Sequence, residues 1–154
     1  TINCVADKYK LPIIFSTHPR TKNKINSSKI KFHPLVKNIE PLGFFDYVNL
    51  QMNSFCVLSD SGTISEESSM LSFPAISIRT STERPEAIDA GSIVLGGIKV
   101  NNVMNSINTC ISTFEKDIAL PSEYKTENVS KKVIRLIQSF TAIVDKEIWN
   151  KNED

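Results

Sequence analysis

The sequence is short of the features that mark several protein classes. It has three cysteines, Cys4, Cys56 and Cys110, which are too few and too scattered for a disulfide framework or a zinc site. No apolar run approaches the length of a membrane span, and no signal peptide is recognisable. A Walker loop, a Gly-x-Ser-x-Gly elbow and a complete dinucleotide fingerprint are also missing. We therefore expect a cytoplasmic protein that binds no membrane, no metal and no organic cofactor.

The sequence also has no excess of either charge. Eighteen basic and seventeen acidic side chains leave a net charge of +1, and a large nucleic-acid footprint would need a basic face. An apolar fraction of 40% in 154 residues suits one domain, or one lobe of a larger protein. The chain starts at Thr1 and has no glycine-rich βα turn before Lys10, which favours an excised fragment.

Short apolar runs alternate with segments of helical spacing along most of the chain. Short apolar runs bounded by polar turns are typical of buried strands. Predicted strands or extended pieces lie at 11–16, 30–33, 39–42, 55–58, 75–78 and 91–97. Predicted helices lie at 1–10, 44–54, after 62, at 101–114 and at 129–149. Because such alternation is typical of parallel sheets, we expect an α/β fold, with a Rossmann-like parallel sheet flanked on both faces by helices.

The clearest local pattern runs from Phe55 to Glu67. An apolar strand, Phe55–Leu58, is followed by the small polar residues Ser59–Gly62 and then by apolar positions Ile64 and Leu71, seven residues apart. This predicts a strand, a sharp turn and a helix. In α/β sheets that unit places backbone N–H groups and the positive end of a helix at the carboxyl edge of the strand. Such a site suits a phosphate group.

Two other predicted strand ends carry polar residues that suit an anion. His18 and Arg20 follow the strand at 11–16, and a polar loop containing Arg84 follows the strand at 75–78. The planar guanidinium fork can donate two parallel hydrogen bonds to phosphate. The alternative is that these residues simply solvate surface loops. The adjacent Glu66 and Glu67 point in different directions on a helix, so they do not form an acid–base pair by themselves.

A series of spaced motifs runs along the chain: His18–Thr21, Ile39–Leu42, Asp60–Glu67, Phe73–Ala75, Arg79, Thr82–Glu86, Gly91 and Leu95–Gly96. These motifs closely resemble those of the non-hydrolysing UDP-N-acetylglucosamine 2-epimerases. The resemblance covers essentially residues 1–115 in order, and because several spaced motifs agree, it is far more specific than a lone glycine pattern.

The resemblance implies an enzyme of two Rossmann-like lobes in the arrangement called GT-B. Residues 1–154 would form its C-terminal, UDP-binding lobe, and the N-terminal lobe would be absent. The family inverts C2 of a UDP-N-acetylamino sugar by eliminating UDP and adding it back, in the cytoplasm, for surface polysaccharide precursors. The full-length protein is expected to be a homodimer. We expect this lobe to be inactive alone, because the family's carboxylates that move the C2 proton come from the N-terminal lobe.

The resemblance also implies a role for seven residues. Ser61 and Gly62 would bind the phosphates. Glu67 would bind the ribose hydroxyls, and Tyr47 would stack on the uracil ring. His18, in a catalytic role, and Arg84 would approach the pyrophosphate and sugar, and Arg20 is a further candidate there.

One departure from the family pattern leaves the sugar open. Most members have a second glycine where this chain has Thr63, and threonine resembles the branch that forms UDP-N-acetyl-L-fucosamine. Two other functions stay open as well, a GT-B glycosyltransferase lobe and a non-catalytic nucleotide-sugar sensor. The Thr82–Glu86 run favours an epimerase over a glycosyltransferase.

Overall fold

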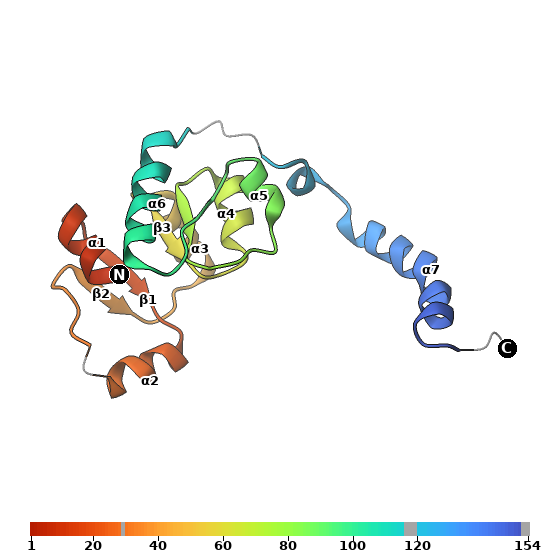
Figure 1. The fold of residues 1–154 in the computed structure, drawn as a ribbon, viewed down its shortest axis with the longest axis horizontal. Coiled ribbons are helices and arrows are strands. Elements are labelled where there is room, and N and C mark those ends of the chain that lie inside the picture. The colour runs from red at the N-terminus through yellow and green to blue at the C-terminus, as the bar shows by residue number, and fades with distance from the viewer. Residues whose placement is uncertain (29, 116–119, 152–154) are drawn as a thin grey trace. The chain divides into compact units, whose positions relative to one another are not determined.

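The computed structural model describes residues 1–28, 30–115 and 120–151. The chain divides into two compact units, Thr1–Pro121 and Ser122–Asp154, and each is described by itself. The elements of the first unit are α1 (Ile2–Tyr9), β1 (Ile13–Ser16), α2 (Pro19–Ser27), β2 (Val36–Ile39), α3 (Phe44–Met52), β3 (Val57–Ser59), α4 (Ile64–Leu71), β4 (Ala75–Ser77), α5 (Pro85–Asp89), β5 (Val94–Leu95) and α6 (Val100–Thr113). Most of them are labelled in Figure 1. The second unit holds a short 3₁₀ helix, Ser122–Lys125, and α7 (Val129–Glu147).

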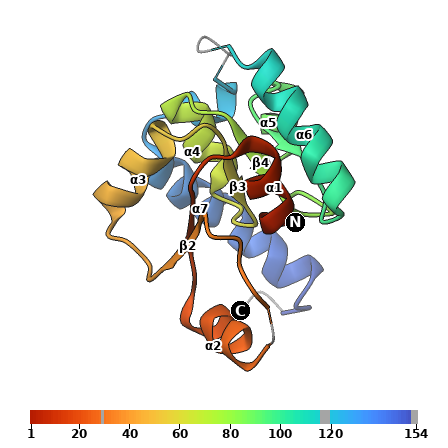
Figure 2. The ribbon, with the colours of Figure 1, turned by 90° about the vertical axis from the view of Figure 1, so that its left-hand side faces the viewer.

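All strand pairings in the described structure are parallel, which confirms the predicted α/β class. β1 pairs with β2, and β3, β4 and β5 pair in that order. The described strands form a two-stranded and a three-stranded sheet. Helices lie on both sides of the larger sheet: Figures 1 and 2 show α4 on one side and α6 on the other.

Helix α1 links the segment that precedes β2 to helix α6 through its side chains. At its start, Asn3 donates from Nδ2 to the Lys31 carbonyl (2.8 Å) and accepts at Oδ1 from the His33 N–H (2.9 Å). At its end, the Tyr9 hydroxyl lies 2.7 Å from Asn108 Oδ1 on α6, and the Tyr9 ring packs against Phe55. The predicted strand at 30–33 is therefore wrong, since a side-chain amide takes the place of a neighbouring strand there.

The core of the first unit is built around β4. Ala75 and Ile76 are fully buried, and Ile76 packs with Val103, Ile107 and Cys110 of α6. The three α6 residues are spaced four and three apart, so they lie on one face of the helix. A strand that is covered on both faces must be apolar almost throughout, which explains why the short run at 75–78 was recognisable as a strand.

Several predicted boundaries shift by a few residues. β3 extends to Ser59 because Ser59 pairs with Ser77, whereas Phe55 lies before the strand and stacks on Tyr9. The strand predicted at 91–97 is only Val94–Leu95. Helix α5 begins at Pro85, where the missing N–H costs no helical hydrogen bond.

In the second unit, α7 is a 19-residue amphipathic helix, as the spacing predicts. Most of its large apolar side chains, including Ile137 and Phe140, are more than half exposed within the structure. Among the described helices, none is both long and apolar enough to cross a membrane.

Gly96 offers a test of the packing at β5. A Cβ atom there would lie 2.7 Å from Ile76 Cγ2 and 3.3 Å from Ser106 Oγ. Because Ile76 is fully buried, Gly96→Ala should lower the free energy of unfolding by about 1–3 kcal/mol, measured by chemical denaturation. Gly62→Ala is the control, since its new methyl would meet only Arg79 Nη1 at 3.9 Å. Equal losses in both variants would contradict this account of the packing.

Candidate functional site

The turn between β3 and α4 presents free backbone donors. The Ser61 N–H donates to Ser59 Oγ (3.1 Å), and Ser61 Oγ shares a 2.9 Å hydrogen bond with Thr63 Oγ1. In the described part of the chain, no group accepts a hydrogen bond from the N–H of Gly62, Thr63 or Ile64. These donors stand at the positive end of α4. Free N–H groups at the start of a helix are the kind of arrangement that suits an anion such as phosphate.

Gly62 keeps this turn open to an approaching group. Its φ angle is not in the left-handed region, and a Cβ would meet only Arg79 Nη1, at 3.9 Å. Nothing within the described chain therefore requires glycine here. A bare backbone at this position leaves room for a group outside the chain to come close. Arg79 also pairs with Glu83, with Nη2 3.5 Å from Oε1, so a guanidinium lies beside the turn.

Helix α3 brings two side chains to Glu67 of α4. Tyr47 and Gln51 are four residues apart, so they share a helix face. Gln51 donates from Nε2 to Glu67 Oε2 at 2.6 Å. Burial, together with the negative charges of Glu67 and Asp60, raises the pKa of Tyr47. The structure thus groups the predicted residues Tyr47 and Glu67 at one place beside the turn.

Arg84 is fixed to the first turn of α4. Its Nε donates to Glu66 Oε1 at 2.6 Å, its Nη1 donates to the Glu83 carbonyl at 3.2 Å, and its backbone N–H donates to Thr82 Oγ1 at 3.0 Å. The second oxygen of Glu66 is buried and accepts no hydrogen bond from the described residues. This pairing places the guanidinium of Arg84 next to the N-terminal end of α4, which follows the turn after β3.

His18 and Arg20 lie on the other sheet, directly after β1. His18 is the N-cap of α2, and its Nδ1 accepts from the Arg20 N–H at 3.3 Å. An acceptor at Nδ1 leaves the proton of a neutral imidazole on Nε2, so His18 presents a donor to a ligand. Between the described parts of His18 or Arg20 and the α4 cluster there is no hydrogen bond or ion pair. The structure therefore groups Tyr47, Ser61, Gly62, Glu67 and Arg84, whereas the described His18 and Arg20 make no hydrogen bond or ion pair to this group.

Sequence reasoning missed three side chains that contact the site. Gln51 and Arg79 were not singled out as site residues, and Glu66 was considered only as a neighbour of Glu67. The spacing of four between Tyr47 and Gln51 was the signal for Gln51. The expectation that Glu66 and Glu67 point apart is confirmed, because one binds Arg84 and the other Gln51.

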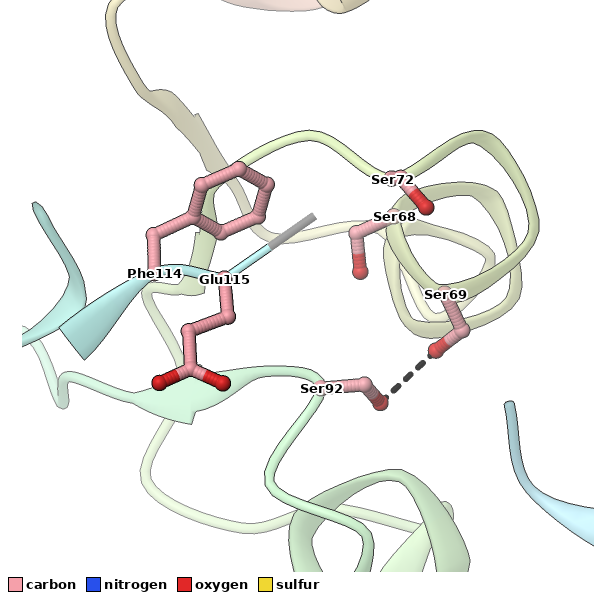
Figure 3. Close-up of a pocket in the computed structure, with 6 residues that line it drawn as sticks. All are labelled: Ser68, Ser69, Ser72, Ser92, Phe114 and Glu115. Atoms are coloured by element: carbon pink, nitrogen blue, oxygen red, sulfur yellow. Dashed lines mark hydrogen bonds between the residues drawn. The ribbon is translucent and has the colours of Figure 1, made fainter. Parts of the chain in front are cut away.

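A small pocket lies near the opposite end of α4 and is separate from this site. Figure 3 shows its lining, which consists of Ser68, Ser69, Ser72, Ser92, Phe114 and Glu115. Ser69 Oγ lies 2.7 Å from Ser92 Oγ, so part of this lining is already paired. None of the residues predicted for the nucleotide lines it. In the described part of the chain, no three His, Cys, Asp or Glu side chains gather as metal ligands.

Comparison with known proteins decides the family. A family model described as UDP-N-acetylglucosamine 2-epimerase matches residues 1–138. The chain belongs to the UDP-N-acetylglucosamine 2-epimerase family. Among curated relatives, the UDP-N-acetylglucosamine 2-epimerase of Methanococcus maripaludis is 35% identical over 117 residues, which are 73% of this chain and 32% of that protein. That of Methanocaldococcus jannaschii is 33% identical over 112 residues, 70% of this chain and 31% of that protein.

Solved structures of the family agree with the fold. The UDP-N-acetylglucosamine 2-epimerase of Rickettsia bellii aligns with a TM-score of 0.79 and 35% identity, covering 97% of this chain and 42% of that chain. The M. jannaschii enzyme in complex with UDP-GlcNAc and UDP aligns with a TM-score of 0.74 and 28% identity, covering 88% of this chain and 38% of that chain. These matches confirm the predicted fold class, a Rossmann-like lobe of the GT-B arrangement. The chain spans about a third of the length of the curated relatives it matches.

The raised pKa of Tyr47 predicts a specific loss of stability in alkali. A group whose pKa is higher in the folded than in the unfolded state contributes its full share to the free energy of unfolding at pH values below its unfolded pKa. For tyrosine that unfolded pKa is about 10. That stabilisation is lost as the pH rises through the folded value, because the phenolate then forms in a partly buried position beside Glu67 and Asp60. Tyr47→Phe should therefore lose less stability than the unmodified chain above about pH 10, in denaturant unfolding at several pH values.

Glu67→Gln is the matched control for this titration. It removes one of the negative charges that raise the pKa of Tyr47, so the phenolate absorbance should titrate at lower pH. Identical alkaline profiles for the unmodified chain, Tyr47→Phe and Glu67→Gln would show that Tyr47 does not face these carboxylates.

Proposed function

We propose that the chain is the C-terminal, UDP-binding lobe of a UDP-N-acetylglucosamine 2-epimerase. The enzyme would invert C2 of a UDP-N-acetylamino sugar by eliminating UDP and adding it back. The observation that carries the proposal is the N-terminus of α4, where the free N–H groups of Gly62, Thr63 and Ile64 stand beside the guanidinium of Arg79. Family membership supplies the reaction class, since the family model matches residues 1–138.

In this proposal the turn and the paired arginine hold the diphosphate. Ser61 and Gly62 bind the phosphates at the helix end, and Arg84 approaches them with a guanidinium that Glu66 already orients. UDP gains negative charge as its bond to the sugar breaks. Donors that are held in place before the reaction therefore stabilise the transition state more than the bound substrate.

The α3–α4 face would hold the nucleoside. Glu67 would accept hydrogen bonds from the ribose hydroxyls, and the Tyr47 ring would stack on uracil. Support comes from their common location beside the turn, seen in the effect of Glu67 on the pKa of Tyr47. Aromatic rings bind bases by stacking with little sequence preference, so the choice of uracil would depend on other contacts.

His18 and Arg20 would meet the substrate from the other sheet. With Nδ1 occupied by the Arg20 N–H, a neutral His18 would donate from Nε2 to the departing pyrophosphate or the sugar, and would not remove the C2 proton. We propose that the base for that proton comes from the N-terminal lobe. The chain covers about a third of its relatives' length, and the remaining two thirds are long enough to form such a lobe.

The full-length enzyme would be a cytoplasmic homodimer that makes precursors of surface polysaccharides, with no cofactor. Thr63 makes UDP-N-acetyl-L-fucosamine formation the second candidate. Its hydroxyl is tied to Ser61 Oγ at 2.9 Å, so it changes the phosphate turn that glycine would leave bare. Comparing turnover of UDP-N-acetylglucosamine with that of the 6-deoxy-talose analogue in the full-length enzyme distinguishes the two.

UDP should stabilise the chain against thermal unfolding. At a UDP concentration 100 times its Kd, the expected gain is about 2.7 kcal/mol. Gly62→Ala should leave the unliganded stability unchanged but weaken UDP binding by about tenfold, or ~1.4 kcal/mol, because its methyl group occupies the phosphate's path. Unchanged affinity in Gly62→Ala would contradict a diphosphate at this turn.

Isotope exchange tests the reaction. The full-length enzyme should incorporate deuterium from D₂O at C2 of the UDP-sugar, and the 154-residue chain alone should not, because the base would be missing. A nucleotide-sugar sensor would bind UDP without exchange, and a glycosyltransferase would transfer the sugar without inverting C2. Exchange by the isolated chain would overturn the assignment of the base to another lobe.

A further inference from the structure

Glu67 does not stand alone at the proposed ribose site. Its Oε2 accepts a 2.6 Å hydrogen bond from Gln51 Nε2, and its Oε1 accepts none from the residues the structure describes. Gln51 comes from α3 and Glu67 from α4, so the contact joins the two helices that flank the turn. One oxygen of the carboxylate is thus held while the other stays available to a ligand.

Gln51 is itself firmly placed. Only 3% of its surface is exposed, which is unusual for a glutamine. The backbone carbonyl of Gln51, at the end of α3, accepts hydrogen bonds from the Ser54 hydroxyl at 2.8 Å and from the Ser54 N–H at 3.2 Å. A buried and anchored donor can orient a carboxylate before a ligand arrives, which reduces the entropy that binding would otherwise remove.

The other end of the Gln51 amide is an unused acceptor. Its Oε1 is buried and has no hydrogen-bond partner among the described residues. Buried polar atoms without a partner are rare and point to a functional role or to a missing ligand or water. Because the donor of the same amide binds Glu67, this acceptor lies next to the carboxylate. The pair therefore offers two acceptor oxygens without a described partner, Gln51 Oε1 and Glu67 Oε1, a chemistry that suits hydroxyl groups.

We propose that Gln51 is a positioning residue that fixes Glu67 for the ribose hydroxyls and so makes the site prefer a ribonucleoside diphosphate to its 2′-deoxy analogue. The inference rests on the proposed UDP site. A site built to pair a hydroxyl rejects an analogue that lacks it, because its own polar groups are then left unpaired. Loss of Gln51 should release the carboxylate and weaken that distinction.

The test compares Kd values for UDP and 2′-deoxy-UDP by titration calorimetry on the full chain. The unmodified chain should bind UDP about tenfold or more tightly than 2′-deoxy-UDP. Gln51→Met has similar length but no donor, so it should weaken UDP binding while leaving 2′-deoxy-UDP binding nearly unchanged. The matched control is Gln138→Met, the same exchange at an exposed position of α7, which should change neither Kd.

A double variant provides a rescue. Gln51→Glu alone places two carboxylates in contact and should lower the preference. Gln51→Glu with Glu67→Gln exchanges donor and acceptor and re-forms the hydrogen bond, so it should recover much of the preference for UDP. This readout remains available if Gln51→Met does not fold.

Three results would overturn the inference. If Gln51→Met weakens both ligands equally, the residue has only a structural role. If the unmodified chain binds UDP and 2′-deoxy-UDP equally, Glu67 does not recognise the 2′-hydroxyl, although the UDP site stands if Gly62→Ala still weakens UDP. If the unmodified chain binds neither, the proposed function fails as well.

Discussion

The pairing of β4 with strands on both of its edges is the constraint on which the candidate site depends. β4 is buried on both faces, pairs in parallel with β3 and β5, and packs against α4 and α6. Parallel strands end at the same edge of a sheet, so the turn after β3 and Arg79 after β4 come together. The close approach of Arg79 Nη1 to Gly62 is the direct result.

The first turn of helix α4 supplies the polar groups at that edge of the sheet. Its N-terminus leaves backbone donors free for an anion, while Glu66 and Glu67 point to different neighbours, Arg84 and Gln51. Acidic residues in the first turn interact favourably with the helix dipole. Each of these two also accepts a hydrogen bond from a side chain of another element. The site is thus prepared by pairs of side chains, and both pairs leave one buried oxygen without a described partner, Gln51 Oε1 and Glu66 Oε2.

Local patterns predicted the units of the fold well and their connections less well. The strand, turn and helix around Gly62 and the amphipathic α7 follow from short-range rules and agree with the structure. The strand at 30–33 was wrong because Asn3, distant in sequence, satisfies its backbone.

The sequence by itself determined the α/β class, the family resemblance and the residues of the phosphate turn, because these depend on composition and on motifs that are contiguous in the chain. Only the tertiary structure decided that Tyr47, Gly62, Glu67 and Arg84 meet around α4 while His18 stands apart on the first sheet. It also decided that Gln51 holds Glu67. Such contacts join residues 16 or 18 positions apart, and their geometry depends on how helices pack on the sheet, which local spacing does not specify.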